Sequence, residues 1–172
     1  MDKTEATKYI LLKFCDWYYE LNPSKKENGE NDLSILKSLK LIFFLCSIEK
    51  DEKTLLDNPF ENFKAMPLGP VEKDVYDFFL EENSIIDYNK TYESAIKNIS
   101  LSVENKELIN ELFEELKNKN YSLINNSARY LVDLTHEWSC WKNNYTKAKE
   151  NSSRIYPIAP HEILEDQKIY SY

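Results

Sequence analysis

Apolar residues recur along most of the chain at spacings of three and four positions, which is the period of a helix with one buried face. The first such stretch runs from about Thr4 to Leu21, and its stripe consists of Ile10, Phe14, Trp17, Tyr18 and Leu21. A second helix is predicted from an N-cap at Asp32 to about Glu49. Apolar residues cover most sides of this second helix, and such a helix usually lies inside a fold. We therefore expect it to be the central helix.

The stretch from Met66 to Tyr76 concentrates the backbone constraints of the chain. Pro67 pushes the residue before it toward an extended conformation, and Gly69 is one of only two glycines. Pro70 suits the first turn of a helix, because its missing N–H is not needed there. The sequence therefore predicts a rigid bend followed directly by an amphipathic helix from about Pro70 to Glu82. The apolar stripe of this helix consists of Val71, Val75, Phe78 and Phe79.

The C-terminal half predicts four further helices: residues 103–118, residues 127–134, a polar helix ending near Glu150, and a short one over 161–167 opened by Pro160. Between the third helix and these, residues 83–92 predict a loop with a short extended piece at Ile85, Ile86 and Tyr88. Residues 155–160 contain two prolines and cannot be helical. Together the elements predict an all-α fold, a single-domain bundle of about six or seven helices with a central apolar helix and little or no sheet.

Composition supports a helical fold and limits the classes of partner that the protein is expected to bind. The chain has 172 residues, of which 42% are hydrophobic, so we expect residues 1–172 to form one domain with a substantial core. Two glycines are too few for a β-sandwich with many turns. The formal net charge of −8 disfavours binding to nucleic acid, because phosphate backbones repel an acidic surface. The same charge favours a partner with a basic surface.

The cysteines and the N-terminus bear on localisation. Cys15, Cys46 and Cys140 are odd in number, far apart and set among apolar residues, which indicates free thiols in a reducing compartment. The N-terminus lacks a cleavable apolar run, and the longest apolar stretch, residues 41–46, is too short to cross a bilayer. We therefore expect a cytoplasmic protein that makes no contact with a membrane.

One pair of residues has the spacing of a chemical site. His136 and Cys140 stand at i and i+4, which is the spacing of two metal ligands on one helix face and also allows a thiol–imidazole pair. A zinc site needs further ligands, and His161, Cys15 and Cys46 share no motif with the pair. No oxyanion element and no phosphate-binding glycine loop accompany it. We therefore expect a structural histidine, no metal, no cofactor and no enzyme, and keep a metal or thiol enzyme centred on this pair as an alternative.

Aromatic residues beside this pair are candidates for a partner surface. Trp138, Trp141 and Tyr145 follow i, i+3, i+7 spacing, which predicts one helical stripe. Such a stripe either packs into the core or faces a partner, because Trp and Tyr are favoured anchors of protein interfaces.

Three segments, in order, resemble the Panacea (SocA-like) antitoxin domain. They are residues 33–44, with the family's apolar helix; residues 60–76, with Leu68-Gly69-Pro70-Val71 and Val75-Tyr76; and residues 131–141, with Thr135-His136 and Trp141. The resemblance covers about residues 33–148, flanked by an N-terminal helix and loop (1–31) and a C-terminal tail with a short helix (149–172). The chain departs from the family where Ala65-Met66 replaces its tryptophan, where Leu68 precedes the glycine, and where Cys140 replaces a common proline.

The resemblance implies an antitoxin of bacteria or their mobile elements that neutralises a co-encoded protein toxin by binding it. One branch of the family resembles a proteolytic adaptor that delivers its toxin to a cytosolic AAA+ protease. An alternative is a phage- or prophage-encoded interaction protein that keeps the fold without a toxin. No catalytic residue carries over, and the motif or partner-binding candidates are Gly69, Pro70, Val71, Tyr76, His136, Trp138 and Trp141.

Overall fold

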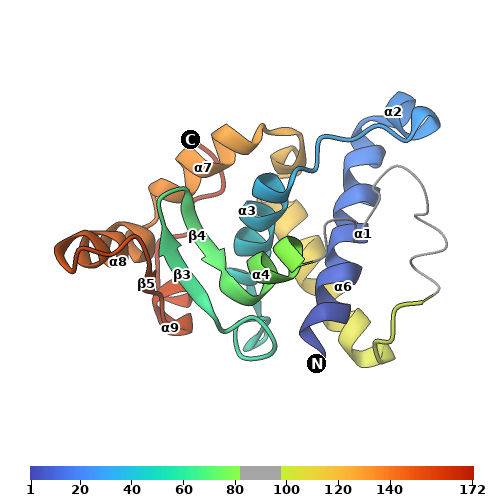
Figure 1. The fold of residues 1–172 in the computed structure, drawn as a ribbon. Helices are drawn as coiled ribbons and strands as arrows, with labels where there is room; N and C mark the ends of the chain where they lie inside the picture. Colours follow the sequence, from blue (N-terminus) through green and yellow to red (C-terminus); the bar gives the residue numbers. More distant parts are fainter. Residues whose placement is uncertain (82–97) are drawn as a thin grey trace.

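The computed structural model describes residues 1–81 and 98–172, and it is mostly helical with small sheets (Figure 1). The helices are α1 (Lys3–Leu21), α2 (Pro23–Asn28), α3 (Ile35–Cys46), α4 (Lys73–Glu81), α6 (Val103–Lys119), α7 (Ala128–His136), α8 (Ser139–Glu150) and α9 (Pro160–Leu164), with a 3-10 turn η1 (Leu123–Asn125). The strands are β1 (Glu49–Lys50), β2 (Lys53–Thr54), β3 (Phe63–Met66), β4 (Gly69–Glu72) and β5 (Tyr156–Pro157). The prediction of a mostly helical protein is confirmed. The predicted loop at 83–92 lies outside the described residues.

Helix α3 is the centre of the fold, as its apolar pattern predicted. Every residue from Lys37 to Cys46 is buried, and α7, β4, α6 and α4 all pack against the helix (Figure 1). The predicted cap at Asp32 is wrong, because Ser34 Oγ accepts the backbone N–H of Lys37, whose Nζ pairs with Asp32 at 2.6 Å. The helix ends at Cys46 and not near Glu49, since the chain turns there into the β1–β2 hairpin.

The stretch expected to begin a helix at Pro70 forms a β-hairpin instead. Strands β3 and β4 pair antiparallel, with Met66 opposite Gly69, so Pro67 and Leu68 form the turn. Pro70 fits this strand because β4 lies at the edge of the three-stranded sheet β4-β3-β5, where a missing N–H is tolerated. The predicted rigid bend is present, whereas the predicted helix begins only at Lys73.

The start of α4 is determined by a buried carboxylate. Glu72 is fully buried, and its carboxylate accepts the backbone N–H of Val75 at 2.9 Å and that of Asn62 at 3.2 Å. Lys3 Nζ neutralises it at 2.7 Å. The acid therefore caps the helix from the preceding strand, which explains why α4 begins three residues later than the proline signal predicts.

The two ends of the chain pack into the same core as the central segments. Phe14 and Trp17 of α1 lie 5.4 and 5.5 Å from the ring of Phe113 on α6. Near the C-terminus, Tyr170 packs against Phe44 of α3, with ring centroids 6.1 Å apart. No helix among the described residues is long and apolar enough to span a bilayer.

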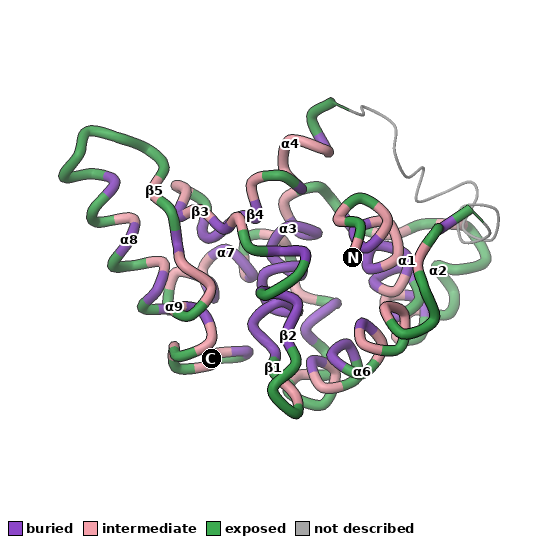
Figure 2. The backbone as a smooth tube through the Cα atoms, turned by 90° about the horizontal axis from the view of Figure 1, so that it is seen from below, coloured by how far each residue is buried: buried purple, intermediate pink, exposed green. Residues whose placement is uncertain are grey.

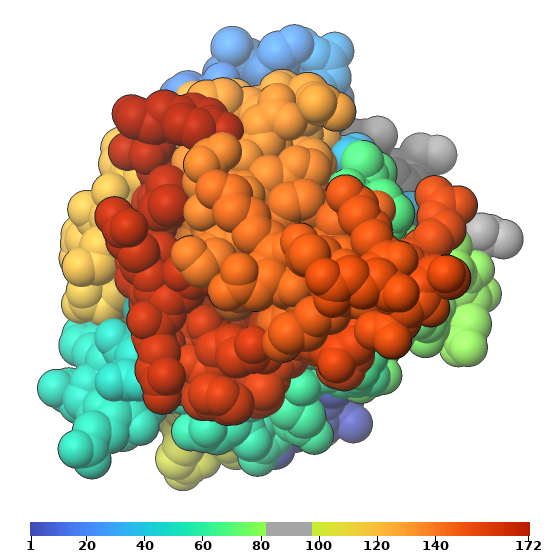
Figure 3. Space-filling view, turned by 90° about the vertical axis from the view of Figure 1, so that its left-hand side faces the viewer, coloured from blue at the N-terminus to red at the C-terminus, as the bar shows by residue number. Residues whose placement is uncertain are grey.

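Helix α8 differs from the other long helices in its placement. It extends away from α3 and the rest of the body, and its far end is exposed (Figures 1 and 2). The chain returns from it through a loop to β5, which pairs with β3 at Lys64 and Ala65. Residues from α7 to the C-terminus, in orange and red, make up most of the face seen in Figure 3.

Candidate functional site at the hairpin turn

Three sequence segments meet at the turn between β3 and β4. Helix α3 packs against both β4 and α7, and α7 packs against β4 as well. The residues that make polar or ring contacts there form what we term the hairpin-turn site: Lys40, Met66, Gly69, Pro70, Thr135, His136 and Trp141. The three segments predicted to share a domain signature thus converge on one small region.

Gly69 is required here for two reasons. Its φ of +96° lies in a region that residues with a side chain rarely adopt. A Cβ at this position would also collide with Thr135 Oγ1 and lie only 3.0 Å from Lys40 Nζ. Thr135 is held in place by a 2.8 Å hydrogen bond that its hydroxyl donates to Val132 O. The glycine therefore allows β4 to approach both α3 and α7.

Lys40 joins the hairpin to the central helix. Its side chain is fully buried, and Nζ donates a 2.7 Å hydrogen bond to Pro70 O. Burial lowers the pKa of this amine to about 7, because the charged form loses its hydration. A lysine within the apolar part of this helix was a visible sequence signal for such a contact, but the sequence analysis did not identify it.

Trp141 joins the hairpin to α8. Its Nε1 donates a 2.9 Å hydrogen bond to Met66 O, and its ring stacks between His136 and Tyr145. The centroid distances are 3.8 Å to His136 and 5.1 Å to Tyr145, with interplanar angles of 9° and 17°. The aromatic stack formed by these three residues lies against the hairpin turn.

His136 has a ring nitrogen without a hydrogen-bond partner in the described part of the chain. Its Nε2 is buried and has no hydrogen-bond partner among the described residues. Burial lowers the pKa of the imidazole, and the nearby charge of Lys40 lowers it further. A neutral ring stacked on Trp141 is the state that this environment favours.

The predicted aromatic stripe is split by the structure. Trp138 precedes α8 and is fully buried, with Nε1 donating to Ile169 O at 3.0 Å and its ring 4.9 Å from Phe43. Only Trp141 and Tyr145 share a face of α8, where their rings stack with centroids 5.1 Å apart. The single-stripe interpretation is therefore wrong, because the helix begins at Ser139.

The remaining predicted positions lie around the same hairpin. Val71 is buried in β4, and Tyr76 is half-buried on α4, where Lys73 Nζ lies 5.9 Å from its ring. Of the seven candidates, Gly69, Pro70, His136 and Trp141 are in direct contact with the site, whereas Trp138 belongs to the core.

His136 and Cys140 do not form the pair that their spacing suggested. Helix α7 ends at His136 and α8 begins at Ser139, so the two residues share no helix face. Burial and the nearby Asp166 raise the pKa of the Cys140 thiol, which opposes formation of a nucleophilic thiolate. Within residues 1–81 and 98–172, no group of three or more His, Cys, Asp or Glu side chains could hold a metal ion.

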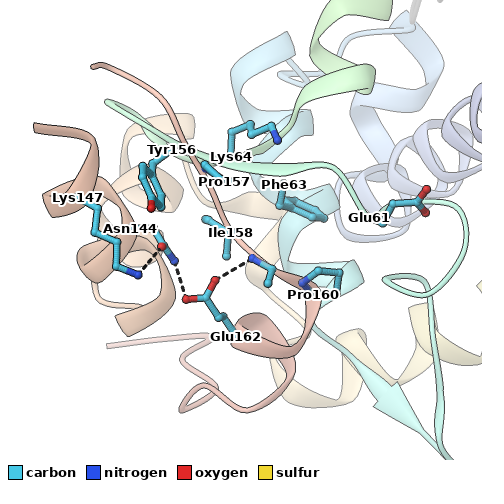
Figure 4. Close-up of a pocket in the computed structure, with 11 residues that line it drawn as sticks. Glu61, Phe63, Lys64, Asn144, Lys147, Tyr156, Pro157, Ile158, Pro160 and Glu162 are labelled. Carbon is cyan, nitrogen blue, oxygen red and sulfur yellow. Dashed lines mark hydrogen bonds between the residues drawn. The ribbon is translucent and has the colours of Figure 1, made fainter. Parts of the chain in front are cut away.

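A hollow of about 370 Å³ lies on the other flank of α8, between this helix, β3 and the segment leading into α9 (Figure 4). Asn144 is buried at its edge and donates to Glu162 Oε1 at 2.9 Å, while Ala159 N–H donates to Glu162 Oε2 at 2.8 Å. Lys147 reaches Asn144 Oδ1 at 3.2 Å and lies 5.7 Å from the ring of Tyr156. The polar groups of this hollow thus tie α8 to the tail.

Comparison with known proteins gives one match. The family model described as "Antitoxin SocA-like, Panacea domain" matches residues 39–142, which is more than half of the chain. The matched range contains all seven residues of the hairpin-turn site. Neither the curated proteins nor the solved structures yield a match.

Proposed function

Because the chain belongs to the family of SocA-like antitoxins with a Panacea domain, we propose that it neutralises a co-encoded protein toxin by binding it directly. The observation that carries this proposal is the family match over residues 39–142. The family is described as antitoxins and not by a reaction, and the buried, raised-pKa thiol of Cys140 gives no support to an enzyme at His136.

The geometry supports a structural role for some candidate residues and contact with the partner for others. Gly69, Pro70 and Val71 hold the hairpin against α3 and α7, which is a structural role. The turn they support presents Leu68, which is 47% exposed. We therefore assign partner contact to the hairpin tip and the neighbouring aromatic stack, and keep Tyr76 on α4 as a further contact candidate.

Two features of the partner and one later step belong to the same proposal. It is a protein encoded beside this chain, as in other toxin–antitoxin pairs. The net charge of −8 favours a partner that is basic on balance, since opposite charges speed association. Delivery of the bound toxin to a cytosolic AAA+ protease is a further step of the proposal, supported only by the resemblance to one branch of the family.

The proposal is tested by co-expression in a bacterial host. The product of the neighbouring gene is induced alone, with this chain, or with the variant Leu68→Asp, and colony formation is counted. We expect growth arrest by the product alone, rescue by the wild-type chain and loss of rescue by the variant. Val103→Asp is the matched control, because Val103 is 67% exposed and lies at the start of α6. Failure of the wild-type chain to rescue growth would contradict the proposed function.

A further inference from the structure

The end of α8 carries an unusual concentration of positive charge for this acidic protein. We term residues 139–156, which comprise α8, the loop returning to β5 and the first residue of β5, the α8 arm. The arm contains four basic residues and one acidic residue, whereas the whole chain has 22 basic and 30 acidic residues. Figure 2 shows the far end of the arm as an exposed projection from the body.

Most basic side chains of the arm form no ion pair with the described residues. Lys142, at the base of the arm, pairs with Glu137 at 3.0 Å. By contrast, Lys147, Lys149 and Arg154 are exposed, and none forms an ion pair with a carboxylate of the described residues. Lys149 and Arg154 therefore remain available to an outside anion, and so does Lys147, although its Nζ also donates to Asn144 Oδ1 at 3.2 Å and lies near the Glu162 carboxylate.

Two of these cations are positioned by aromatic rings. Lys149 Nζ lies 4.7 Å from the centroid of the Tyr145 ring, and Lys147 Nζ lies 5.7 Å from that of Tyr156. Contact with an aromatic face orients an ammonium group without removing its charge. Lys147 and Lys149 lie in the last turn of α8, where the helix dipole also favours them, but Arg154 lies beyond the helix. The helix dipole therefore explains the positions of Lys147 and Lys149 but not that of Arg154.

The backbone at the tip of the arm is ordered by its own hydrogen bonds. Ser153 N–H donates to Ala148 O at 2.8 Å, and Asn151 Nδ2 donates to Lys147 O at 2.8 Å. Ser153 Oγ in turn donates to Ile155 O at 2.8 Å. The exposed cations are thus displayed on a defined scaffold, which lowers the entropy cost of binding.

We propose that the α8 arm docks into an acidic surface of the protein toxin. This inference rests on the proposed function. It specifies one contact surface of this chain and the charge of the toxin surface that it meets. An acidic protein surface fits better than a nucleic acid, because an extended phosphate backbone would also meet the acidic remainder of this chain. A partner that is basic on balance can still present a local acidic groove to the arm.

The test measures affinity for the purified product of the neighbouring gene by calorimetry at two salt concentrations. The variant Lys147→Glu/Lys149→Glu reverses two exposed charges of the arm. Lys26→Glu/Lys53→Glu is the matched control, since both lysines are exposed, lack an ion pair among the described residues and change the net charge equally. We expect the arm variant to bind at least about tenfold more weakly and with less dependence on salt, and the control to bind within about threefold of the wild type.

The other outcomes distinguish failure of the arm proposal from failure of the proposed function. If the wild type binds and the arm variant binds equally well, the arm proposal is overturned and the proposed function stands. If the wild type does not bind, the proposed function fails and the arm proposal fails with it. Binding of a 30-base-pair DNA duplex that only the arm variant loses would assign the arm to nucleic acid instead. Lys147→Arg/Lys149→Arg should bind like the wild type, and unchanged thermal melting of all variants excludes loss of fold.

Discussion

Individual residues of the hairpin-turn site show how few atoms hold the central elements together. Gly69 leaves the space that Thr135 Oγ1 and Lys40 Nζ occupy, and Lys40 then bonds to the adjacent Pro70 O. His136 and Trp141 complete the site through their ring stack and the hydrogen bond from Trp141 Nε1 to Met66 O. At the scale of single residues, backbone conformation and buried polar groups determine how closely the hairpin packs against α3 and α7.

Replacing Gly69 by alanine should lower the free energy of unfolding by about 2–4 kcal/mol. The strain of a positive φ contributes about 1–2 kcal/mol, and the collision with Thr135 Oγ1 contributes a similar amount. Urea unfolding measures the change. Gly29→Ala is the control, because Gly29 has a positive φ of 67° at the end of α2 but no such collision. Equal losses at both positions would show that the close approach is not important.

The buried amine of Lys40 should make stability depend on pH. Its folded pKa of about 7 lies below the ordinary value of 10.5, so between these values the unfolded chain binds more protons than the folded one. Stability then rises with pH through this window, by about 1 kcal/mol per pH unit. We expect urea unfolding of the wild type at pH 7.0 and 8.5 to show this rise, and Lys40→Met to show a flatter profile. A rise of the same size in the variant would assign it to other groups.

Elements rather than single residues decide where the hairpin lies. Helix α3 supports β4 from one side, while Trp141 of α8 is bonded to the last residue of β3. The strands themselves are only four residues long, and so short a hairpin is not stable alone. The position of the hairpin tip, and of any partner contact it makes, therefore depends on α3 and α8.

The variant Trp141→Phe tests this dependence. It removes the N–H that bonds to Met66 O and keeps an aromatic ring between His136 and Tyr145. We expect amide hydrogens of β3 and β4 to exchange about fivefold faster, in line with a loss of about 1 kcal/mol for one hydrogen bond. Tyr145→Phe, which keeps the ring in the stack and removes only a hydroxyl, should leave the exchange unchanged. Unchanged exchange in Trp141→Phe would show that the bond does not hold the hairpin.

Sequence pattern identified the long helices, the central role of α3 and the rigid bend, since all three depend on local periodicity or on proline and glycine. The β-hairpin was not predicted because β4 contains Pro70, which also suits a helix start, and continues into α4, so that one apolar stripe spans a strand and a helix. The sequence pattern also did not predict the contacts of the buried residues Lys40 and Glu72. Their partners are backbone groups or residues far away in the chain. The placement of Trp138 in the core depended on a helix start that pattern alone did not locate.

The whole molecule combines a body that is acidic overall with a basic arm, and its terminal segments complete the core. Phe113 of α6 is covered by α1, and Trp138 is covered by Tyr170 of the tail, with ring centroids 5.9 Å apart. The family match at residues 39–142 is thus flanked by segments that bury part of it.

A fragment of residues 33–148 should therefore not fold alone. It would expose the apolar surface of Phe113 and Trp138, which α1 and the tail otherwise cover. We expect weak helical circular dichroism and no cooperative thermal transition for the fragment, but strong helical circular dichroism and a cooperative thermal transition for residues 1–172. Cooperative melting of the fragment would show that the flanking segments are accessory.

The stoichiometry of neutralisation tests most directly whether this chain acts by binding and not by chemistry. The purified chain is titrated into a fixed amount of the purified product of the neighbouring gene, the remaining toxic activity is measured, and both intact masses are recorded. We expect activity to fall in proportion to the chain added, to reach zero at a fixed molar ratio, and to leave both masses unchanged. Loss of activity at a small fraction of that ratio, or a changed mass of the product, would contradict the account.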